Sequence, residues 1–154
     1  MVRNSIHLPA QFSFTCSIPV RITDLNYGGH VGNDSVLTLL HEARMQWLHS
    51  LGFTELAFAG VGMIMADVTI EFKKELFYGD TVIASVQPSN LSRIGFDLIY
   101  KLEKETEGKK VIVAIARTGM ICYDYEKKKI VLVPDAARIS LQSTVDSTQS
   151  TVGS

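Results

Sequence analysis

The 154-residue sequence has little cysteine, no marked excess of charge and no long apolar run. Its two cysteines, Cys16 and Cys122, fall in strand-like segments without the nearby histidines of a zinc site, so we expect reduced core residues and no bound metal. Fifteen Lys and Arg against sixteen Asp and Glu give a net charge of −1, which argues against nucleic acid or an acidic membrane as a partner. No segment approaches about 18 consecutive apolar residues, and the first residues lack the apolar core of a signal peptide. We therefore expect a soluble, cytoplasmic protein.

The most distinctive segment is residues 21–52, in which a polar glycine-rich loop runs directly into an apolar helix. From Asp34 onward, apolar residues recur at spacings of three and four, which predicts a helix buried over most of its circumference. Asn33, Asp34 or Ser35 could cap the start of this helix, and Gly52 marks its end. A buried central helix preceded by a polar loop is the feature that the rest of the fold must accommodate.

The rest of the chain predicts mainly antiparallel strands joined by short turns. Alternation of apolar and polar residues indicates strands near residues 12–23, 66–73, 81–86, 94–102, 111–123 and 130–133. Pro19 suggests that the first strand lies at an edge or carries a bulge. One long helix supplies too few crossovers for a parallel sheet, so residues 1–139 are expected to form one α+β domain, an antiparallel sheet curled around the helix. Residues 140–154 are rich in Ser, Thr and Gln without periodicity and are expected to be a disordered tail.

A sheet curled around one helix leaves its other face and its edges open. Open strand edges are normally paired or covered in stable proteins. We therefore expect a homodimer or a homotetramer.

Four short motifs occur in a fixed order along the chain. They are Asp24-Leu-Asn26-Tyr-Gly-Gly29-His30-Val31-Gly-Asn33, His41-Glu42-Ala43-Arg44, Tyr78-Gly79-Asp80 and Leu91-Ser92-Arg93-Ile94-Gly95. Together they resemble the hotdog-fold acyl-CoA thioesterases, the group that includes 4-hydroxybenzoyl-CoA thioesterase and the Tol-Pal-associated thioesterases. The resemblance covers about residues 14–134. It implies a hotdog fold and an enzyme that cleaves an acyl-CoA thioester to a carboxylic acid and free coenzyme A, without a cofactor.

Position 26 departs from the family pattern, because Asn26 stands where the family has its catalytic second acid. A neutral amide cannot take a proton from water at neutral pH. Either another group acts as the base, or the chain binds acyl-CoA or an acyl carrier without hydrolysing it. A hydratase or dehydratase of the same fold is a third alternative.

Thioester hydrolysis also needs hydrogen-bond donors for the oxyanion that develops on the carbonyl oxygen. Free backbone N–H groups at the start of a helix supply such donors. The candidates for this oxyanion and thioester-binding backbone are Gly29, Val31, Gly32 and Asn33.

The candidates for the base are His30, Asp24 and Glu42, and Asn26 could orient the water or the carbonyl. Each candidate also has a structural interpretation. His30 could be a structural histidine, Asp24 a turn or cap acid, and Glu42 a member of a surface stripe or an internal salt bridge.

Four polar residues are candidates for binding coenzyme A: Lys73, Lys74, Ser92 and Arg93. They would contact its phosphates only if the fold places them at the mouth of the acyl slot. Otherwise they are ordinary surface residues.

Overall fold

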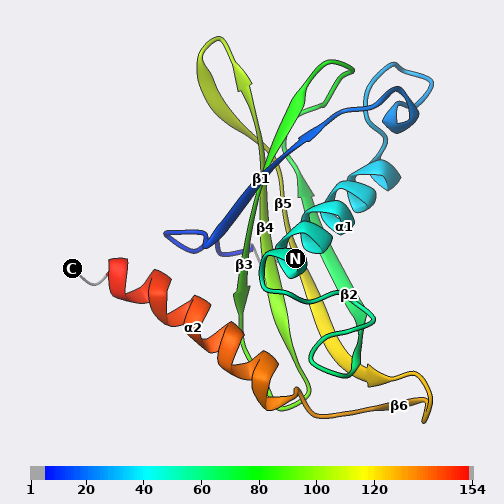
Figure 1. The fold of residues 1–154 in the computed structure, drawn as a ribbon. Coiled ribbons are helices and arrows are strands. Elements are labelled where there is room, and N and C mark those ends of the chain that lie inside the picture. The colour runs from blue at the N-terminus through cyan, green and yellow to red at the C-terminus, as the bar shows by residue number, and fades with distance from the viewer. Residues whose placement is uncertain (1–5, 153–154) are drawn as a thin grey trace, which may run out of the picture.

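A computed structural model describes residues 6–152 and shows an antiparallel sheet with one long helix lying across one face (Figure 1). In chain order the elements are β1 (Phe14–Pro19), the 3₁₀ turn η1 (Ile22–Asp24), α1 (Asn33–Ser50), β2 (Gly62–Phe72), β3 (Thr81–Ser89), β4 (Gly95–Thr106), β5 (Lys109–Asp124), β6 (Lys129–Ile130) and α2 (Asp135–Val152). The strands follow the order β1-β3-β4-β5-β2, and β6 pairs with β5. This arrangement confirms the expected α+β hotdog fold.

The first strand lies at an edge of the sheet, as Pro19 indicates. β1 pairs only with β3, so the missing N–H of Pro19 faces no second neighbouring strand. The strand is shorter than its alternating pattern predicts, because η1 follows and exposes Ile22. In that turn the backbone N–H of Arg21 donates to the carboxylate of Asp24 at 2.8 Å, which ends the extended conformation.

Helix α1 begins at Asn33, and its start differs from the expectation. The preceding cap is Gly32, in an extended conformation, and no side chain caps the helix. The predicted cap at Asn33, Asp34 or Ser35 is therefore wrong, because the hydrogen-bonded loop before Gly32 already fixes how the chain enters the helix. The helix ends as expected, with Gly52 in the left-handed region at φ 83°.

The buried surface of α1 is one face rather than most of the circumference. The buried residues are Val36, Leu39, Leu40, Ala43, Arg44, Trp47 and Leu48. Trp47 packs on Phe96 of β4, with ring centroids 6.0 Å apart. Leu37 and Met45 each remain more than one-third exposed.

Arg44, from the second motif, is buried and ties α1 to the sheet. Its guanidinium donates to the Tyr100 hydroxyl at 3.0 Å and lies 3.7 Å from Glu55, which also pairs with His41 at 2.7 Å. The Tyr100 hydroxyl in turn lies 2.8 Å from the Thr118 hydroxyl. Burial raises the pKa of Tyr100, so this phenol stays protonated and can donate. These contacts give Arg44 a structural role in the core.

Residues 140–152 differ from the expected disordered tail, because α2 continues through them to Val152. Ala137 and Leu141 are both fully buried, and α2 packs against β3. Residues four apart share one face of a helix, so these two side chains give α2 a narrow apolar stripe. The final residues 153–154 of the expected tail lie outside the described part.

We expect Leu141→Ala to lower the free energy of unfolding by about 2 to 5 kcal/mol, because it empties a site in which the leucine side chain is 1% exposed. Ile139→Ala on the same helix is the matched control, since Ile139 is 70% exposed. Its effect should stay within about 0.5 kcal/mol. Chemical denaturation of both variants checks this, and equal stabilities would contradict the packing of α2.

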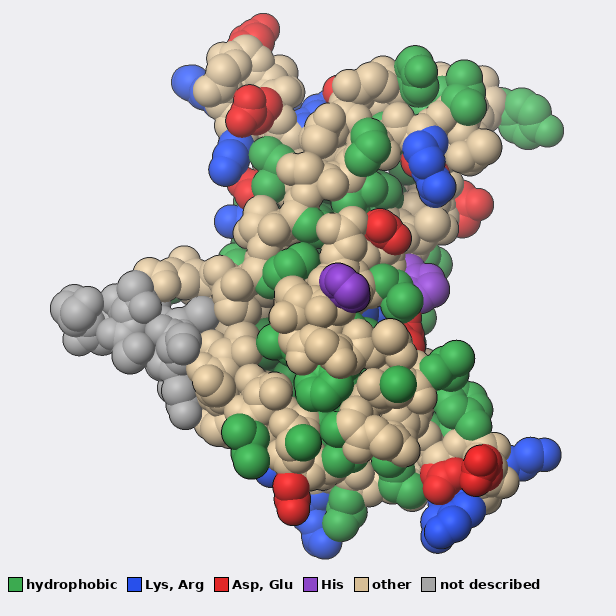
Figure 2. Space-filling model, viewed as in Figure 1, with side chains coloured by type: hydrophobic (Ala, Val, Ile, Leu, Met, Phe, Trp, Pro, Cys, Tyr) green, Lys and Arg blue, Asp and Glu red, His purple; other side chains and the backbone are tan. Residues whose placement is uncertain are grey.

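Charged side chains on the surface are of mixed sign. On the face shown in Figure 2, Lys and Arg side chains lie intermingled with Asp and Glu side chains. Within the described residues, no helix combines the length and the apolar character needed to span a bilayer.

Candidate active site

The glycine-rich loop before α1 is a tight, internally hydrogen-bonded turn. The N–H of Asn26 donates to the carbonyl of His30 at 2.8 Å, and the N–H of Gly29 donates back to the carbonyl of Asn26 at 3.1 Å. Gly29 adopts a positive φ of 80°, which favours glycine. The side-chain oxygen of Asn26 accepts the N–H of Gly28 at 2.8 Å. Asn26 therefore helps to shape the turn, through a hydrogen bond that a neutral amide oxygen can accept.

This loop is joined to the connection between β2 and β3. The N–H of Val31 donates to the carbonyl of Leu76 at 2.8 Å, and His30 forms an isolated β-bridge with Phe77. The imidazole of His30 packs edge-on to the Phe77 ring, and its Nε2 lies 4.0 Å from Oε1 of Glu75. These contacts bring a histidine and a carboxylate from distant parts of the chain to the same place.

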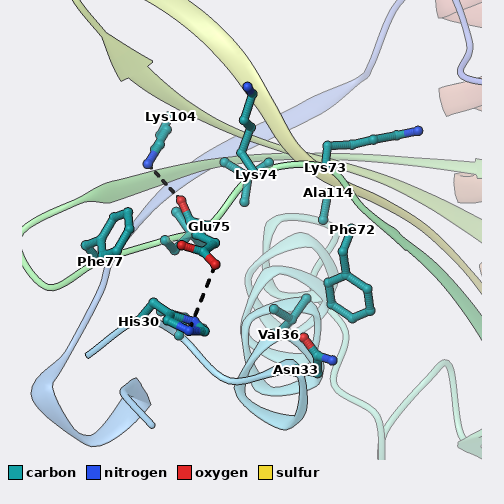
Figure 3. A pocket seen from close by; sticks show the side chains of 13 residues that line it. His30, Asn33, Val36, Phe72, Lys73, Lys74, Glu75, Phe77, Lys104 and Ala114 are labelled. Atoms are coloured by element: carbon teal, nitrogen blue, oxygen red, sulfur yellow. Dashed lines mark hydrogen bonds and ion pairs between the residues drawn. The ribbon is translucent and has the colours of Figure 1, made fainter. Parts of the chain in front are cut away.

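A cavity of about 580 Å³ opens between the loop, the first turn of α1 and the segment after β2 (Figure 3). The charged and aromatic side chains that line it are His30, Phe72, Lys73, Lys74, Glu75, Phe77 and Lys104. Glu75 is the one carboxylate among the lining residues. The cavity thus combines apolar rings, a histidine, cations and a free helix start.

Asn33 provides the helix start. As the first residue of α1 its N–H has no intrahelical partner, and no acceptor for it is found among the described residues. Of the other three expected donors, Gly29 and Val31 use their N–H groups within the fold, and Gly32 donates weakly to the Asp24 carbonyl at 3.4 Å. The structure therefore leaves Asn33, which lines the cavity, as the available donor of the four.

Lys104 holds one wall of the cavity in place. Its Nζ donates to the backbone carbonyl of Glu75 at 2.8 Å, pairs with Asp80 at 3.3 Å and lies 5.2 Å above the Phe77 ring. Asp80, from the third motif, also accepts the N–H of Phe77 at 2.9 Å. The segment that carries Glu75 is therefore held at Glu75 by Lys104 and at Phe77 by Asp80.

Lys73 and Lys74 lie where the expected coenzyme A contacts could be made. Both backbone N–H groups donate to the carbonyl of Val113, which fixes the chain beside the cavity. Figure 3 shows their amino groups directed outward, away from His30. Cations in this position suit phosphate groups outside the cavity.

Two of the expected catalytic acids lie elsewhere. Asp24 is buried, and its carboxylate is held by the Arg21 side chain at 3.2 Å as well as by the Arg21 backbone. Glu42 is on an exposed part of α1, where it accepts a hydrogen bond from Gln46 at 2.9 Å. Its charge acts instead on Cys16 of β1, whose pKa is raised first by burial and then by Glu42. Neither acid lines the cavity.

Ser92 and Arg93 lie in the turn between β3 and β4, at the opposite end of these strands from the cavity. Ser92 closes that turn through hydrogen bonds with Gly95 at 3.1 Å. The backbone carbonyl of Arg93 accepts the N–H of Val133 at 2.9 Å. Within one chain, these two residues are not brought to Lys73 and Lys74.

Sequence reasoning did not identify Glu75, Phe72, Phe77 or Lys104. The charged run from Lys73 to Glu75 resembles the solvated end of a strand, and Lys104 falls in a charged hairpin. Nothing local distinguishes Glu75 from other exposed acids. Its relation to His30 depends on a pairing between segments far apart in the sequence.

Comparisons with known proteins agree with the fold described above. The family model described as Thioesterase-like superfamily matches residues 20–141. A 1,4-dihydroxy-2-naphthoyl-CoA hydrolase from Thermosynechococcus vestitus is 30% identical over 127 residues, covering 80% of this chain and 85% of the relative. The solved structure of a 1,4-dihydroxy-2-naphthoyl-CoA thioesterase from Synechocystis is similar with a TM-score of 0.74 at 20% identity, covering 84% of this chain and 95% of that one. An aspartate-to-asparagine mutant of 4-hydroxybenzoyl-CoA thioesterase, complexed with 4-hydroxybenzoyl-CoA, gives a TM-score of 0.76 at 16% identity, covering 83% and 97%.

Proposed function

The chain belongs to the thioesterase-like superfamily and hydrolyses acyl-CoA thioesters, and we propose that its substrate is an aromatic acyl-CoA bound in the cavity at the start of α1. The observation that carries this proposal is the meeting of the free N–H of Asn33 with the rings of Phe72 and Phe77 in one cavity. Hydrolysis is favoured over binding alone, because the relative at 30% identity is named a hydrolase.

The proposed binding mode follows from the chemistry of the lining. The acyl ring packs against Phe72 and Phe77, since offset or edge-on aromatic contacts are favourable. The thioester carbonyl accepts a hydrogen bond from the N–H of Asn33, where the helix dipole also favours negative charge. The phosphates of coenzyme A meet Lys73 and Lys74 at the mouth. His30 stands beside the carbonyl as the base for the attacking water.

A thiol-release assay over aromatic, short aliphatic and long aliphatic acyl-CoAs tests the proposed function. We expect the highest kcat/KM with aromatic acyl groups. Preference for a long aliphatic chain would contradict the proposed substrate class, and no release from any of these substrates would contradict hydrolysis itself.

We also propose that the active unit is a homodimer or a larger homo-oligomer, in which the β2 edges of two copies pair. β2 is eleven residues long and lies at the edge of the sheet opposite β1, with Met65, Val68 and Phe72 partly exposed. A long, apolar free edge is a template for pairing with another strand. A two-fold axis would make that pairing antiparallel.

Such pairing would explain the distribution of the expected coenzyme A residues. The cavity lies at the Phe72 end of β2, whereas the turn of Ser92 and Arg93 lies at the Gly62 end, next to the paired residues Gly95 and Ile121. Antiparallel pairing of two β2 strands places the Phe72 end of one copy beside the Gly62 end of the other. Ser92 and Arg93 of one copy could then approach Lys73 and Lys74 of the other.

Light scattering at micromolar concentration tests the assembly. We expect a mass of at least twice the 17.0 kDa of the chain, because burial of the β2 edge removes unpaired backbone groups from water. A monomer that retains full thiol release would contradict an active site completed by two copies.

A cytoplasmic location is part of this proposal. Cys16 and Cys122 are free thiols, as is usual in a reducing compartment.

A further inference from the structure

The cavity contains a histidine and a carboxylate that face each other. Nε2 of His30 lies 4.0 Å from Oε1 of Glu75, and Figure 3 shows both side chains directed toward the same space. His30 is about one-third exposed and Glu75 is 62% exposed, so water reaches both groups. The pair sits in the same cavity as Asn33.

The ring of His30 is confined on two sides. It packs edge-on to Phe77, and a side chain at Gly28 would come within 3.1 Å of Nε2. The backbone of Glu75 is held by Lys104, and the next residue, Leu76, accepts the N–H of Val31. His30 and Glu75 therefore lie on two segments that are hydrogen-bonded to each other.

No other acid in the described part of the chain lines the cavity. Asp24 is buried against Arg21, Glu42 is outside the cavity, and Asp80 is paired with Lys104. Position 26 holds an amide whose oxygen is already bonded to Gly28. Glu75 is the remaining carboxylate that lines the cavity.

We infer that Glu75 is the positioning residue for His30, and that this pair replaces the catalytic acid missing at position 26. The inference rests on the proposed function. Nε2 of His30 is directed at Glu75, so Nδ1 is the nitrogen that accepts the proton. The carboxylate orients the ring and stabilises the imidazolium that forms.

The step balances without a further reactant. As the water oxygen forms a bond to the thioester carbon, one water proton passes to Nδ1 of His30 and the carbonyl electron pair moves to the oxygen held by Asn33. When the carbonyl reforms, the carbon–sulfur bond breaks and its electron pair leaves on sulfur. The imidazolium returns the proton to sulfur, which gives the carboxylic acid and the free thiol.

The test compares Glu75→Gln, His30→Gln and the double variant in the thiol-release assay with the best acyl-CoA. Glu75→Gln should lower kcat at least about tenfold with KM changed less than about threefold, because the base stays in place but loses its counter-charge. Glu75→Asp should recover part of the loss. In the His30→Gln background, Glu75→Gln should change kcat by less than about threefold, since groups that act as a unit are not additive.

Glu126→Gln is the matched control, because Glu126 is an exposed acid in the turn between β5 and β6. It should retain the parent rate. The role proposed for the pair would be overturned if Glu75→Gln kept the parent kcat, or if the loss in the double variant equalled the product of the two single losses. The proposed function would stand in either case. Absence of thiol release by the parent chain would overturn both. An unchanged oligomer mass shows that each variant is folded.

Discussion

Replacing Asn33 with proline is expected to lower kcat by about 10²- to 10³-fold, the usual cost of removing one oxyanion donor. Proline lacks a backbone N–H, so the substitution deletes the one group of Asn33 on which the proposed mechanism depends. The Asn33 side chain is not required by that mechanism. The effect should fall mainly on kcat, because the hydrogen bond strengthens as charge develops on the oxygen.

The geometry at Asn33 accepts proline without loss of the helix. Proline is favoured at the first position of a helix, where its missing N–H would have no partner. The preceding Gly32 has φ −71° and ψ 158°, a conformation that is compatible with a following proline. Circular dichroism and oligomer mass should therefore match the parent.

Asn33→Ala is the matched control, because it removes the side chain and keeps the N–H. It should retain activity within about fivefold of the parent, against the far larger loss expected for proline. Equal activity of the two variants would show that the oxyanion is bound elsewhere.

The second large effect is expected for His30→Ala, which should lower kcat/KM by about 10²- to 10⁴-fold, the range for a positioned general base. The imidazole lines the cavity and can take a proton from water and return it to sulfur. Little stability should be lost, because the ring is partly exposed and its contacts are an edge-on packing with Phe77 and a distant ion pair.

His49→Ala controls for the loss of a histidine, since His49 is exposed at the far end of α1. It should behave as the parent in the same thiol-release assay. Full activity of His30→Ala would assign the base to another group and remove the role proposed for Glu75 as well.

The fold was predictable because its signals are local. The alternating strands and the apolar spacing of α1 identify an antiparallel sheet around a helix, and Pro19 places the first strand at an edge. The helical tail was missed because Leu141 is the one fully buried apolar residue of residues 140–145, which otherwise are mostly Ser, Thr and Gln. A single apolar residue every fourth position is too narrow a stripe to stand out as helical periodicity.

The candidate site was predictable only in part. The loop motif identified His30 and Asn33, which the structure brings to one cavity. It could not show that the N–H of Val31 is used by Leu76, nor that Glu75 faces His30, because both depend on contacts between distant segments. The departure at Asn26 pointed to another base, for which the sequence offered His30, Asp24 and Glu42 but not Glu75.

A crystal structure with a ketone analogue of an aromatic acyl-CoA, in which a methylene replaces the thioester sulfur, tests the central claim most directly. The carbonyl oxygen should lie about 2.7–3.1 Å from the backbone nitrogen of Asn33, the distance for an oxyanion donor. The acyl ring should lie against Phe72 and Phe77, with His30 beside the carbonyl carbon. A carbonyl bound away from the start of α1, for example beside Asp67 and Arg117 in the separate cavity that they line, would contradict the account.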